Sequence, residues 1–225
     1  MNQQKLKSTA KHLLFLNDLS EQTLKELNSD KKLKVSCNGL IQISEIPFDK
    51  GELDQNKTWV FTSRNAVEIV LKNKIPLSQS IYAVGEKTAS LLPNATIPKI
   101  ASALEVAKLI IKEQLQEVIF ICGNRRRDEL PDLLTSHAIK LKEVVVYESK
   151  NLNKTVNLQS IDGLAFMSPS SVYSLAQNGG FMNLPCFAIG LTTAQALNNE
   201  GQKCIISKST TAQSLVDIAK HYFNQ

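Results

Sequence analysis

Small hydroxyl residues and glycines follow short apolar runs at four points in the sequence. The run TWVFTS ends in Thr62 and Ser63, LAFMS ends in Ser168, and IYAVG and CFAIG end in Gly85 and Gly190. Residues at helical spacing come after each run, so each turn leads from a strand into a helix. The first backbone N–H groups of a helix have no partner within it, and small side chains let a bulky ligand approach them. These turns could therefore bind an anion.

The same residues could also serve the fold alone. Serine and threonine are preferred at the N-cap of a helix, and Ser168 precedes Pro169, an arrangement typical of a cap followed by proline in the first turn. Duplication does not separate the two interpretations, because a copied fold copies its caps. From the residues alone both stay open.

The turns belong to a unit that occurs twice, in Thr58–Leu92 and Gly163–Leu197. Each copy predicts strand, hydroxyl turn, helix, strand, glycine turn and helix, which is the order of an open α/β sheet. In such a sheet ligands bind at the carboxyl ends of the strands, where all four turns lie. The pairs that share one separation of 105 positions (166−61) are Phe61 and Phe166, Ser63 and Ser168, Val67 and Val172, Gly85 and Gly190, Thr88 and Thr193, and Leu92 and Leu197.

Each copy is preceded by a block that predicts a strand, a helix and a half-exposed strand. The strands are Leu13–Leu16 and Leu40–Ile46 in the first block, and Val118–Cys122 and Lys142–Glu148 in the second. Further amphipathic helices are predicted over 102–115 and 211–223.

Polar stretches at 47–56 and 149–160 follow these two blocks and predict linkers. Two assemblies fit this order. Tandem domains would pair each block with the copy that follows it, whereas an interlocked arrangement would place both chain ends in one domain. The linkers lie where the interlocked arrangement needs its two crossings, and they favour it.

Composition limits the class of protein. Of 225 residues, 43% are hydrophobic and the formal net charge is +5, which is ordinary for a soluble globular protein and permits an anionic ligand. No RNA-binding motif accompanies that charge, so nucleic acid is not an expected partner. Four cysteines without CxxC spacing indicate reduced thiols in a cytoplasmic protein, and three scattered histidines predict no metal site. The basic N-terminal segment has an apolar run of four residues, too short for a signal peptide or a membrane span.

The chain resembles the uroporphyrinogen-III synthase family over nearly its whole length. The matching motifs are FTSRNAV, AVGEKTA, CGN with Arg127 and Leu130-Pro131, VVVYES, FMSPSSV and AIGLTTA. The resemblance implies two similar flavodoxin-like α/β domains with parallel sheets, joined by a two-stranded linker, the first domain made of both chain ends. The implied boundaries are 1–40 with 152–225 for domain 1, 46–145 for domain 2, and about 41–46 and 146–151 for the linkers.

The resemblance also implies a hydro-lyase of tetrapyrrole (haem) biosynthesis that needs no cofactor. The family cyclises hydroxymethylbilane to uroporphyrinogen III with loss of water, inverting the terminal pyrrole ring through a spiro intermediate. A cytoplasmic monomer without a membrane partner is expected. The substrate carries eight carboxylates, which suits turns with free N–H groups. The expected substrate-binding residues are Thr62, Ser63, Gly85, Lys87, Thr88, Gly123, Asn124, Arg127, Ser168, Ser170, Ser171, Gly190, Thr192 and Thr193.

Tyr147 is the expected catalytic residue, because it matches a tyrosine on the family's linker strand. Its phenol could assist loss of the substrate hydroxyl as a general acid. Tyrosine is also a common strand residue at an apolar–polar boundary, which is the structural interpretation. The enzyme's main task would then be conformational, since the linear substrate can close unaided to the uninverted isomer.

Some residues depart from the family pattern or have a simpler interpretation. Asn17-Asp18 stands where many bacterial members carry an arginine after the first strand, which puts a substrate contact there in doubt. Arg125 and Arg126 are expected to be solvated, and an exposed lysine at a helix start would look the same as a ligand-binding Lys87.

Two other functions fit a pair of α/β lobes. One is a non-catalytic two-domain protein that binds a small anionic ligand by hinge motion. The other is a flavodoxin-type nucleotide or FMN protein, although neither GxGxxG nor a Walker A sequence is present.

Overall fold

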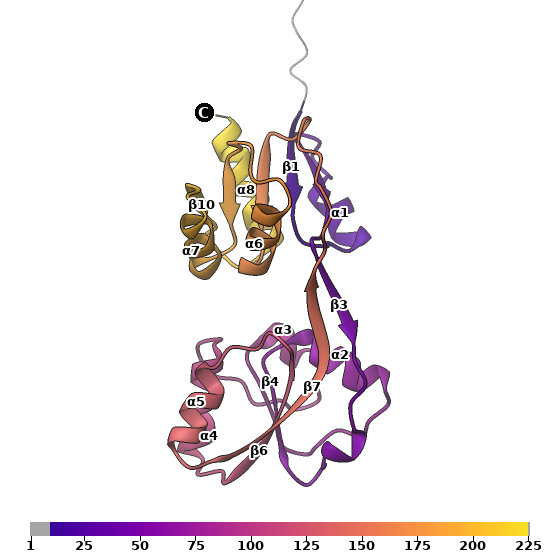
Figure 1. The fold of residues 1–225 in the computed structure, drawn as a ribbon, viewed down its shortest axis with the longest axis vertical. Coiled ribbons are helices and arrows are strands. Elements are labelled where there is room, and N and C mark those ends of the chain that lie inside the picture. The colour runs from indigo at the N-terminus through magenta and orange to yellow at the C-terminus, as the bar shows by residue number, and fades with distance from the viewer. Residues whose placement is uncertain (1–9, 225) are drawn as a thin grey trace, which may run out of the picture. The chain divides into compact units, whose positions relative to one another are not determined.

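The computed structural model describes residues 10–224, which form two compact units (Figure 1). Unit 1 contains the described residues up to Gln42 and those from Asn151 onward, and unit 2 is Ile43–Lys150. Both chain ends therefore contribute to unit 1. The start of the basic N-terminal segment, residues 1–9, lies outside the described residues.

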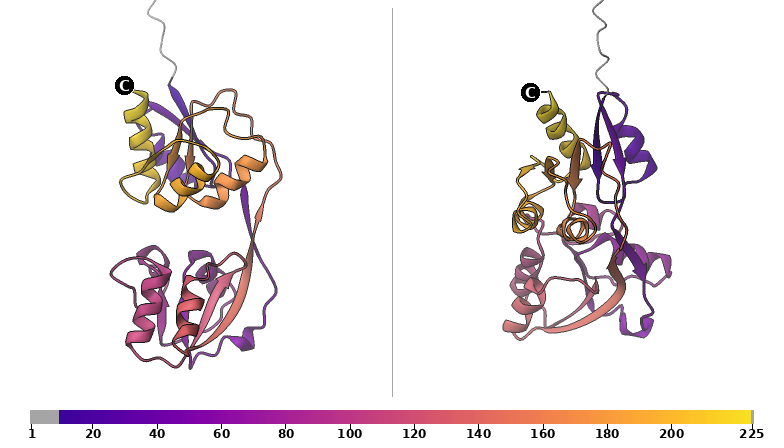
Figure 2. Two further views of the ribbon diagram at one scale, coloured as in Figure 1. Left: turned by 60° about the vertical axis from the view of Figure 1, so that its left-hand side comes forward. Right: turned by 45° about the horizontal axis from the view of Figure 1, so that its top comes forward.

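Unit 1 is built on a five-stranded sheet in the order β10-β9-β8-β1-β2, and its neighbouring strands pair in parallel. Helices α6 and α7 pack on one face of the sheet and α1 and α8 on the other (Figure 2). The strands are β1 (Lys11–Phe15), β2 (Leu33–Cys37), β8 (Gly163–Phe166), β9 (Cys186–Ala188) and β10 (Cys204–Ile206). The helices are α1 (Glu21–Leu27), α6 (Pro169–Gln177), α7 (Leu191–Asn199) and α8 (Ala212–Phe223).

The alternation of a strand explains the two cores of this unit. Along β1, Leu14 joins the core under α6 and α7, whereas Leu13 and Phe15 join the core under α1 and α8. All three are at most 5% exposed. A strand with helices on both sides of its sheet is buried on both faces, which is why this run is apolar throughout.

Unit 2 has the strand order β3-β7-β6-β4-β5, with parallel pairing from β7 to β5. Its cores lie on the two faces of the sheet, one against α2 and α3 and one against α4 and α5. The strands are β3 (Ile41–Glu45), β4 (Thr58–Phe61), β5 (Ile81–Ala83), β6 (Glu117–Gly123) and β7 (Lys140–Asn151). The helices are the 3₁₀ turn η1 (Lys50–Glu52), α2 (Arg64–Lys72), α3 (Glu86–Ala89), α4 (Ala103–Lys112) and α5 (Glu129–Ser136).

The chain passes between the units through β3 and β7, which run antiparallel. The Ile46 N–H donates to the Val146 carbonyl at 3.1 Å, and the Leu152 N–H donates to the Leu40 carbonyl at 2.8 Å. The predicted fold class, two similar α/β units with parallel sheets, is confirmed.

The repeat is visible in the strand order. The order β9-β8-β1-β2 of unit 1 corresponds to β5-β4-β6-β7 of unit 2. An isolated parallel bridge between Tyr82 and Thr96 beside β5 occupies the place that β10 has beside β9.

Three local predictions were wrong. The helix predicted at the end of the first copy, up to Leu92, ends at Ala89. Pro93 disfavours helical backbone in Leu92, and nothing in the structure explains why Ser90 and Leu91 also lie outside the helix. The stretch 47–56 is not a plain linker, because it contains η1 and its Leu53 is 4% exposed in the core. The second predicted linker, 149–160, likewise begins inside β7 and supplies buried apolar residues to unit 1.

Candidate functional site

The β4–α2 turn of unit 2 places Thr62 and Ser63 at the carboxyl end of β4. Both residues are partly exposed. Ser63 is the N-cap of α2, and its Oγ accepts the Asn65 N–H at 3.2 Å. It also accepts the phenol O–H of Tyr147 at 2.9 Å. Ser63 therefore caps α2 and also accepts a hydrogen bond from Tyr147 on β7.

Tyr147 is 9% exposed and lies against Gly123, its partner in the pairing of β6 with β7. Burial raises the pKa of the phenol, and hydrogen bonds with Ser63 and Asn65 partly oppose that rise. Tyr147 is therefore protonated at neutral pH. Its hydroxyl can donate a hydrogen bond or a proton, which is the chemistry required of a general acid.

The β6–α5 turn contains Gly123 and Asn124, and it is fixed to β7 by two bonds. The Asn124 N–H donates to the Tyr147 carbonyl at 3.0 Å, and the Asn124 Oδ1 accepts the Ser149 N–H at 2.8 Å. Asn124 itself is exposed. This turn and the β4–α2 turn are brought together because β6 and β4 are neighbours in the sheet.

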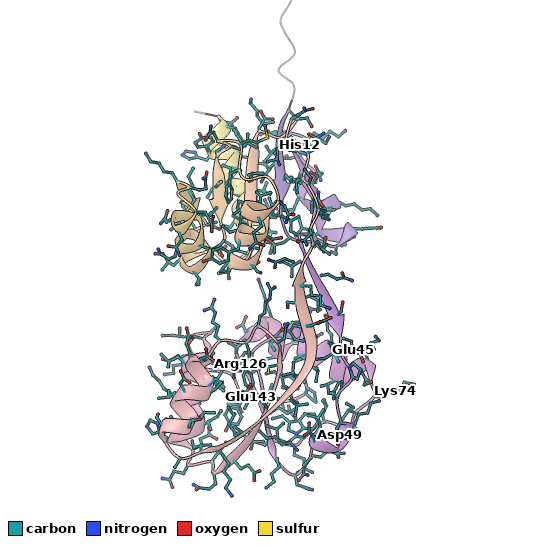
Figure 3. All side chains as sticks on the ribbon, in the orientation of Figure 1. His12, Glu45, Asp49, Lys74, Arg126 and Glu143 are labelled. Carbon is teal, nitrogen blue, oxygen red and sulfur yellow. The ribbon has the colours of Figure 1, made fainter. Side chains whose placement is uncertain are left out.

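Of the arginines after this turn, Arg126 differs from expectation. Arg126 was expected to be solvated, but its side chain is 27% exposed and forms a two-point ion pair with Glu143 at 2.6 and 2.8 Å, with a further pair to Asp128 (Figure 3). This pairing raises the Arg126 pKa. Arg127, the predicted substrate contact, is 57% exposed with a loose 3.9 Å contact to Glu129. Arg126 thus fastens the turn to β7, and Arg127 faces solvent.

Gly85 begins α3 beside the β4–α2 turn, and the Val84 N–H donates to the Phe61 carbonyl at 2.9 Å. Lys87 is exposed on the first turn of this helix. Thr88 is 5% exposed, and its N–H donates to the Gly85 carbonyl at 3.0 Å. α3 has four residues, and so short a helix carries little dipole.

In unit 1 the β8–α6 turn gathers Ser168, Ser170 and Ser171. The Ser168 Oγ caps α6 through the Ser171 N–H at 3.4 Å and lies 3.0 Å from the Ser170 Oγ. Ser168 and Ser170 are partly exposed, whereas Ser171 is fully buried. Sequence reasoning missed the residue that joins this cluster: Asn17, which follows β1, accepts the Met167 N–H at 2.8 Å and the Ser171 hydroxyl at 3.1 Å, and donates to the Ser168 Oγ at 3.1 Å.

Gly190 begins the nine-residue helix α7 next to this cluster. The Ile189 N–H donates to the Phe166 carbonyl at 3.0 Å, which is the counterpart of the Val84 bond in unit 2. A Cβ added to Gly190 would meet nothing within 4 Å. Thr192 is exposed, and Thr193 is 3% exposed. The turn is open above the glycine, and the Thr193 side chain is part of the core.

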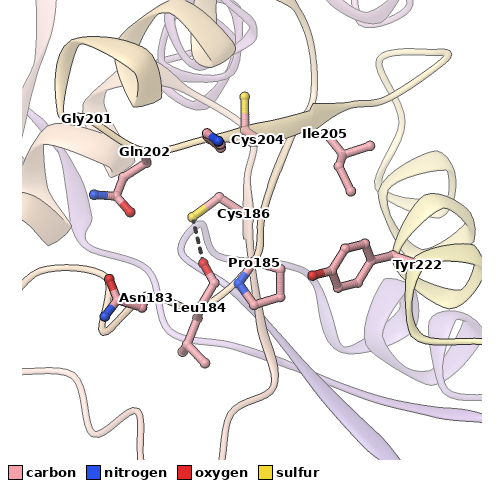
Figure 4. Close-up of a pocket in the computed structure, with 10 residues that line it drawn as sticks. Asn183, Leu184, Pro185, Cys186, Gly201, Gln202, Cys204, Ile205 and Tyr222 are labelled. Atoms are coloured by element: carbon pink, nitrogen blue, oxygen red, sulfur yellow. Dashed lines mark hydrogen bonds between the residues drawn. The ribbon is translucent and has the colours of Figure 1, made fainter. Parts of the chain in front are cut away.

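Figure 4 shows a pocket of about 440 Å³ in unit 1. It lies at the amino ends of β9 and β10, whereas the turns described above follow the carboxyl ends of their strands. It is lined by Cys186 and Cys204, the first residues of β9 and β10, and by Tyr222. Burial raises the pKa of the Cys186 thiol to about 12, so this is an unreactive thiol. The pocket contains none of the predicted site residues.

Residues 10–224 hold neither a metal centre nor a membrane span. No group of three or more His, Cys, Asp or Glu side chains in that range is placed to bind a metal ion. None of the helices in the same range is long and apolar enough to cross a membrane.

Comparison with known proteins gives a consistent relationship. A model of the family HEM4, described as uroporphyrinogen-III synthase HemD, matches residues 24–217. Uroporphyrinogen-III synthase of Saccharomyces cerevisiae is 25% identical over 206 residues, covering 72% of this chain and 75% of the yeast protein.

Two solved structures share the fold. Uroporphyrinogen-III synthetase from Helicobacter pylori matches with a TM-score of 0.68 and 22% identity, over 94% of this chain and 99% of that one. A mutant uroporphyrinogen III synthase from Thermus thermophilus matches with a TM-score of 0.62 and 14% identity, over 96% of this chain and 98% of that one.

The family match spans most of the chain, and the motifs that carry it include the turns described above. The chain therefore belongs to the uroporphyrinogen-III synthase family of haem-biosynthesis enzymes.

Proposed function

We propose that the protein cyclises hydroxymethylbilane to uroporphyrinogen III, with loss of water and inversion of the terminal pyrrole ring. Family membership supports the reaction class. The observation that carries the proposal is the position of the hydroxyl and glycine turns, which end neighbouring strands at the carboxyl edge of both sheets and begin helices. A substrate with eight carboxylates needs many such anion-binding positions.

The turns have unequal shares in binding. α2, α6 and α7 have nine residues each, so their first turns present free N–H groups and an appreciable dipole. The partly exposed hydroxyls add donors of their own. The buried Thr88 and Thr193 would act only by shaping their turns. The residues proposed to form the substrate-binding turns, either by contact with the substrate or by shaping the turn, are Thr62, Ser63, Gly85, Lys87, Thr88, Gly123, Asn124, Arg127, Ser168, Ser170, Ser171, Gly190, Thr192 and Thr193.

Tyr147 is the proposed general acid. As the C–O bond of the substrate's hydroxymethyl group breaks, the phenol O–H is shared with the departing oxygen, which leaves as water. The Ser63 hydroxyl, which accepts from the phenol when no substrate is bound, can then stabilise the phenolate oxygen. The terminal ring attacks through its substituted carbon because the bound carboxylates hold the chain bent. The phenolate regains a proton when the substrate loses a ring proton at the end of the reaction.

The domain and cellular assignments accompany this proposal. The domains are 1–40 with 152–225 and 46–145, with linkers at about 41–46 and 146–151. The protein acts as a cytoplasmic monomer on a small-molecule substrate. A sedimentation or light-scattering measurement of molar mass tests the monomer directly.

The deciding assay supplies hydroxymethylbilane to the purified protein and separates the oxidised porphyrin isomers. The expected product is isomer III, against isomer I in a blank and in a heat-denatured control. Formation of isomer I alone would refute synthase activity. Tight binding of the bilane without conversion would instead favour a non-catalytic anion-binding protein.

A further inference from the structure

Asn17 stands at the carboxyl end of β1, beside the serine cluster that begins α6. We propose that Asn17 is a positioning residue that holds this serine turn in the conformation that binds a substrate carboxylate. The inference rests on the proposed function, and it adds to that function a residue outside the expected site.

The amide of Asn17 uses both of its ends. Its Oδ1 accepts the Met167 N–H at 2.8 Å and the Ser171 hydroxyl at 3.1 Å, and its Nδ2 donates to the Ser168 Oγ at 3.1 Å. The backbone donor at Met167 fixes which end of the amide is the oxygen. Aspartate at this position could supply the acceptor but not the donor, and alanine could supply neither.

The turn needs this support because its own cap is weak. The bond from the Ser171 N–H to the Ser168 Oγ is 3.4 Å long, beyond the usual range for an N–H donor. Asn17 ties Ser168, Met167 and Ser171 to the end of the neighbouring strand, so the N-terminus of α6 is held in one geometry. Preorganised donors bind an anion more tightly than mobile ones, because no ordering is required at binding.

Asn17 also sorts the three serine hydroxyls. The Ser171 hydroxyl is directed at Asn17 and at the Ser168 carbonyl, 2.8 Å away, and Ser171 is fully buried. The Ser168 Oγ accepts from Asn17 at 3.1 Å and donates to the Ser171 Oγ at 3.3 Å, so Ser168 and Ser171 are both bound into the network around Asn17. Ser168 and Ser170 are partly exposed, so a carboxylate can reach their side chains, whereas the buried Ser171 acts as support.

In unit 2 a different residue forms the hydrogen bond that holds the serine N-cap. There the cap Ser63 accepts from Tyr147 of β7, whereas the residue 105 positions after Asn17 is Cys122, which is buried in the core. In both units a side chain from elsewhere in the sheet holds the serine cap: Tyr147 lies on β7, and Asn17 follows β1. The two anchors do not occupy corresponding positions, and the repeat therefore did not predict Asn17.

The test compares Asn17→Asp and Asn17→Ala with the wild type in steady-state assays on hydroxymethylbilane. Asn17→Asp keeps both acceptor bonds but loses the donor and places a negative charge at an anion-binding turn. We expect both variants to fold and to raise KM about tenfold, with kcat changed less than about twofold, since a contact made equally in ground and transition states acts on KM. As the salt concentration rises and screens the added charge, the KM of Asn17→Asp should move closer to the KM of the wild type.

Asn28 provides a matched control. Its amide also donates and accepts, bonding Leu24 and Val35 at the end of α1, away from the serine turn. Asn28→Ala should lower the melting temperature and leave KM unchanged.

A KM unchanged in both Asn17 variants, or raised equally in Asn28→Ala, overturns the positioning role while the wild type remains an active synthase. A wild type that forms isomer I alone overturns the proposed function instead, and this inference with it.

Discussion

Gly123 lies directly against the ring of Tyr147: a Cβ placed on Gly123 would be 2.3 Å from the Cζ of that ring and 2.4 Å from its Cε2. The two residues pair across β6 and β7, beyond a shift in register after Cys122. Only a residue without a Cβ permits this approach, and through it the phenol of Tyr147 passes over β6 to reach Ser63 after β4. Gly123 is thus required by contact with Tyr147 and needs no unusual backbone angle.

Replacing Gly123 with alanine should destabilise the protein by about 1–3 kcal/mol, the usual cost of forcing extra atoms into a packed position. Urea unfolding at neutral pH measures this cost. In a Tyr147→Ala background the same change should cost less than about 0.5 kcal/mol, because the ring that it meets is gone. Equal costs in the two backgrounds would mean that the clash is not with Tyr147.

Gly85 and Gly190 correspond in the repeat, but alanine should affect them differently. A Cβ on Gly85 would lie 2.9 Å from the Ala101 Cβ, whereas one on Gly190 meets nothing within 4 Å. Gly85→Ala should therefore lose roughly 1–3 kcal/mol of stability. Gly190→Ala should unfold like the wild type and raise KM for hydroxymethylbilane, since only a ligand would occupy the open space. An unstable Gly190→Ala, or one with an unchanged KM, contradicts this assignment.

The fold could be predicted from the sequence where the repeat and the apolar period agree. The 105-residue spacing of Phe61 and Phe166 indicated two similar sheets, and both residues lie in buried strands that correspond. β10 was not predicted, because the repeat offered no counterpart for it: unit 2 has an isolated bridge between Tyr82 and Thr96 in that place. The buried residues Val156 and Leu158 were missed inside a polar stretch, since isolated apolar residues carry no pattern.

The candidate site was predictable only in part. A hydroxyl residue between an apolar run and a helical pattern indicates a helix start. Ser63 and Ser168 were predicted at helix starts on this basis and are found there. Contacts between distant segments leave no such signal. Asn17 bonds residues 150 and more positions away, and Arg126 was expected in solvent because nothing in its neighbourhood along the chain pointed to Glu143.

Substitution of Arg126 should lower the stability of the protein, whereas substitution of Arg127 should weaken substrate binding. Arg126→Gln breaks a partly buried two-point pair with Glu143 and should cost about 1 kcal/mol, with little effect on KM once the protein is folded. Arg127→Gln should change stability by less than about 0.5 kcal/mol and raise KM, since its side chain is 57% exposed and proposed to meet a carboxylate. Chemical denaturation and kinetics on both variants check this. The reverse pattern would exchange their roles.

Tyr147→Phe should keep the fold and lower kcat about tenfold, the effect of removing one hydrogen bond from the transition state. The assay must include Ser63→Ala. If Tyr147 acts only by holding the Ser63 cap, Ser63→Ala will lower kcat as much as Tyr147→Phe does. The variant with both changes will then have the same kcat as each single variant. If Tyr147 donates to the leaving oxygen, Ser63→Ala will lower kcat less than Tyr147→Phe does. An unchanged rate with isomer III as product removes Tyr147 from the mechanism.

The buried phenol of Tyr147 also predicts how stability changes in alkali. Its pKa is raised in the folded protein by burial, so the folded chain keeps the phenolic proton after the unfolded chain has released it near pH 10. The unfolded state then binds fewer protons, and stability falls as the pH rises above about 10. The fall should be shallower in Tyr147→Phe, by up to about 1.4 kcal/mol per pH unit, the value for one proton. Tyr82, whose pKa is raised by burial and by Glu113, gives Tyr82→Phe as a comparison that should behave alike. Urea unfolding at pH 9 and pH 11 measures the loss of stability in the wild type and in each variant. If the wild type and Tyr147→Phe lose the same free energy of unfolding, the Tyr147 phenol has the same pKa in the folded and the unfolded chain.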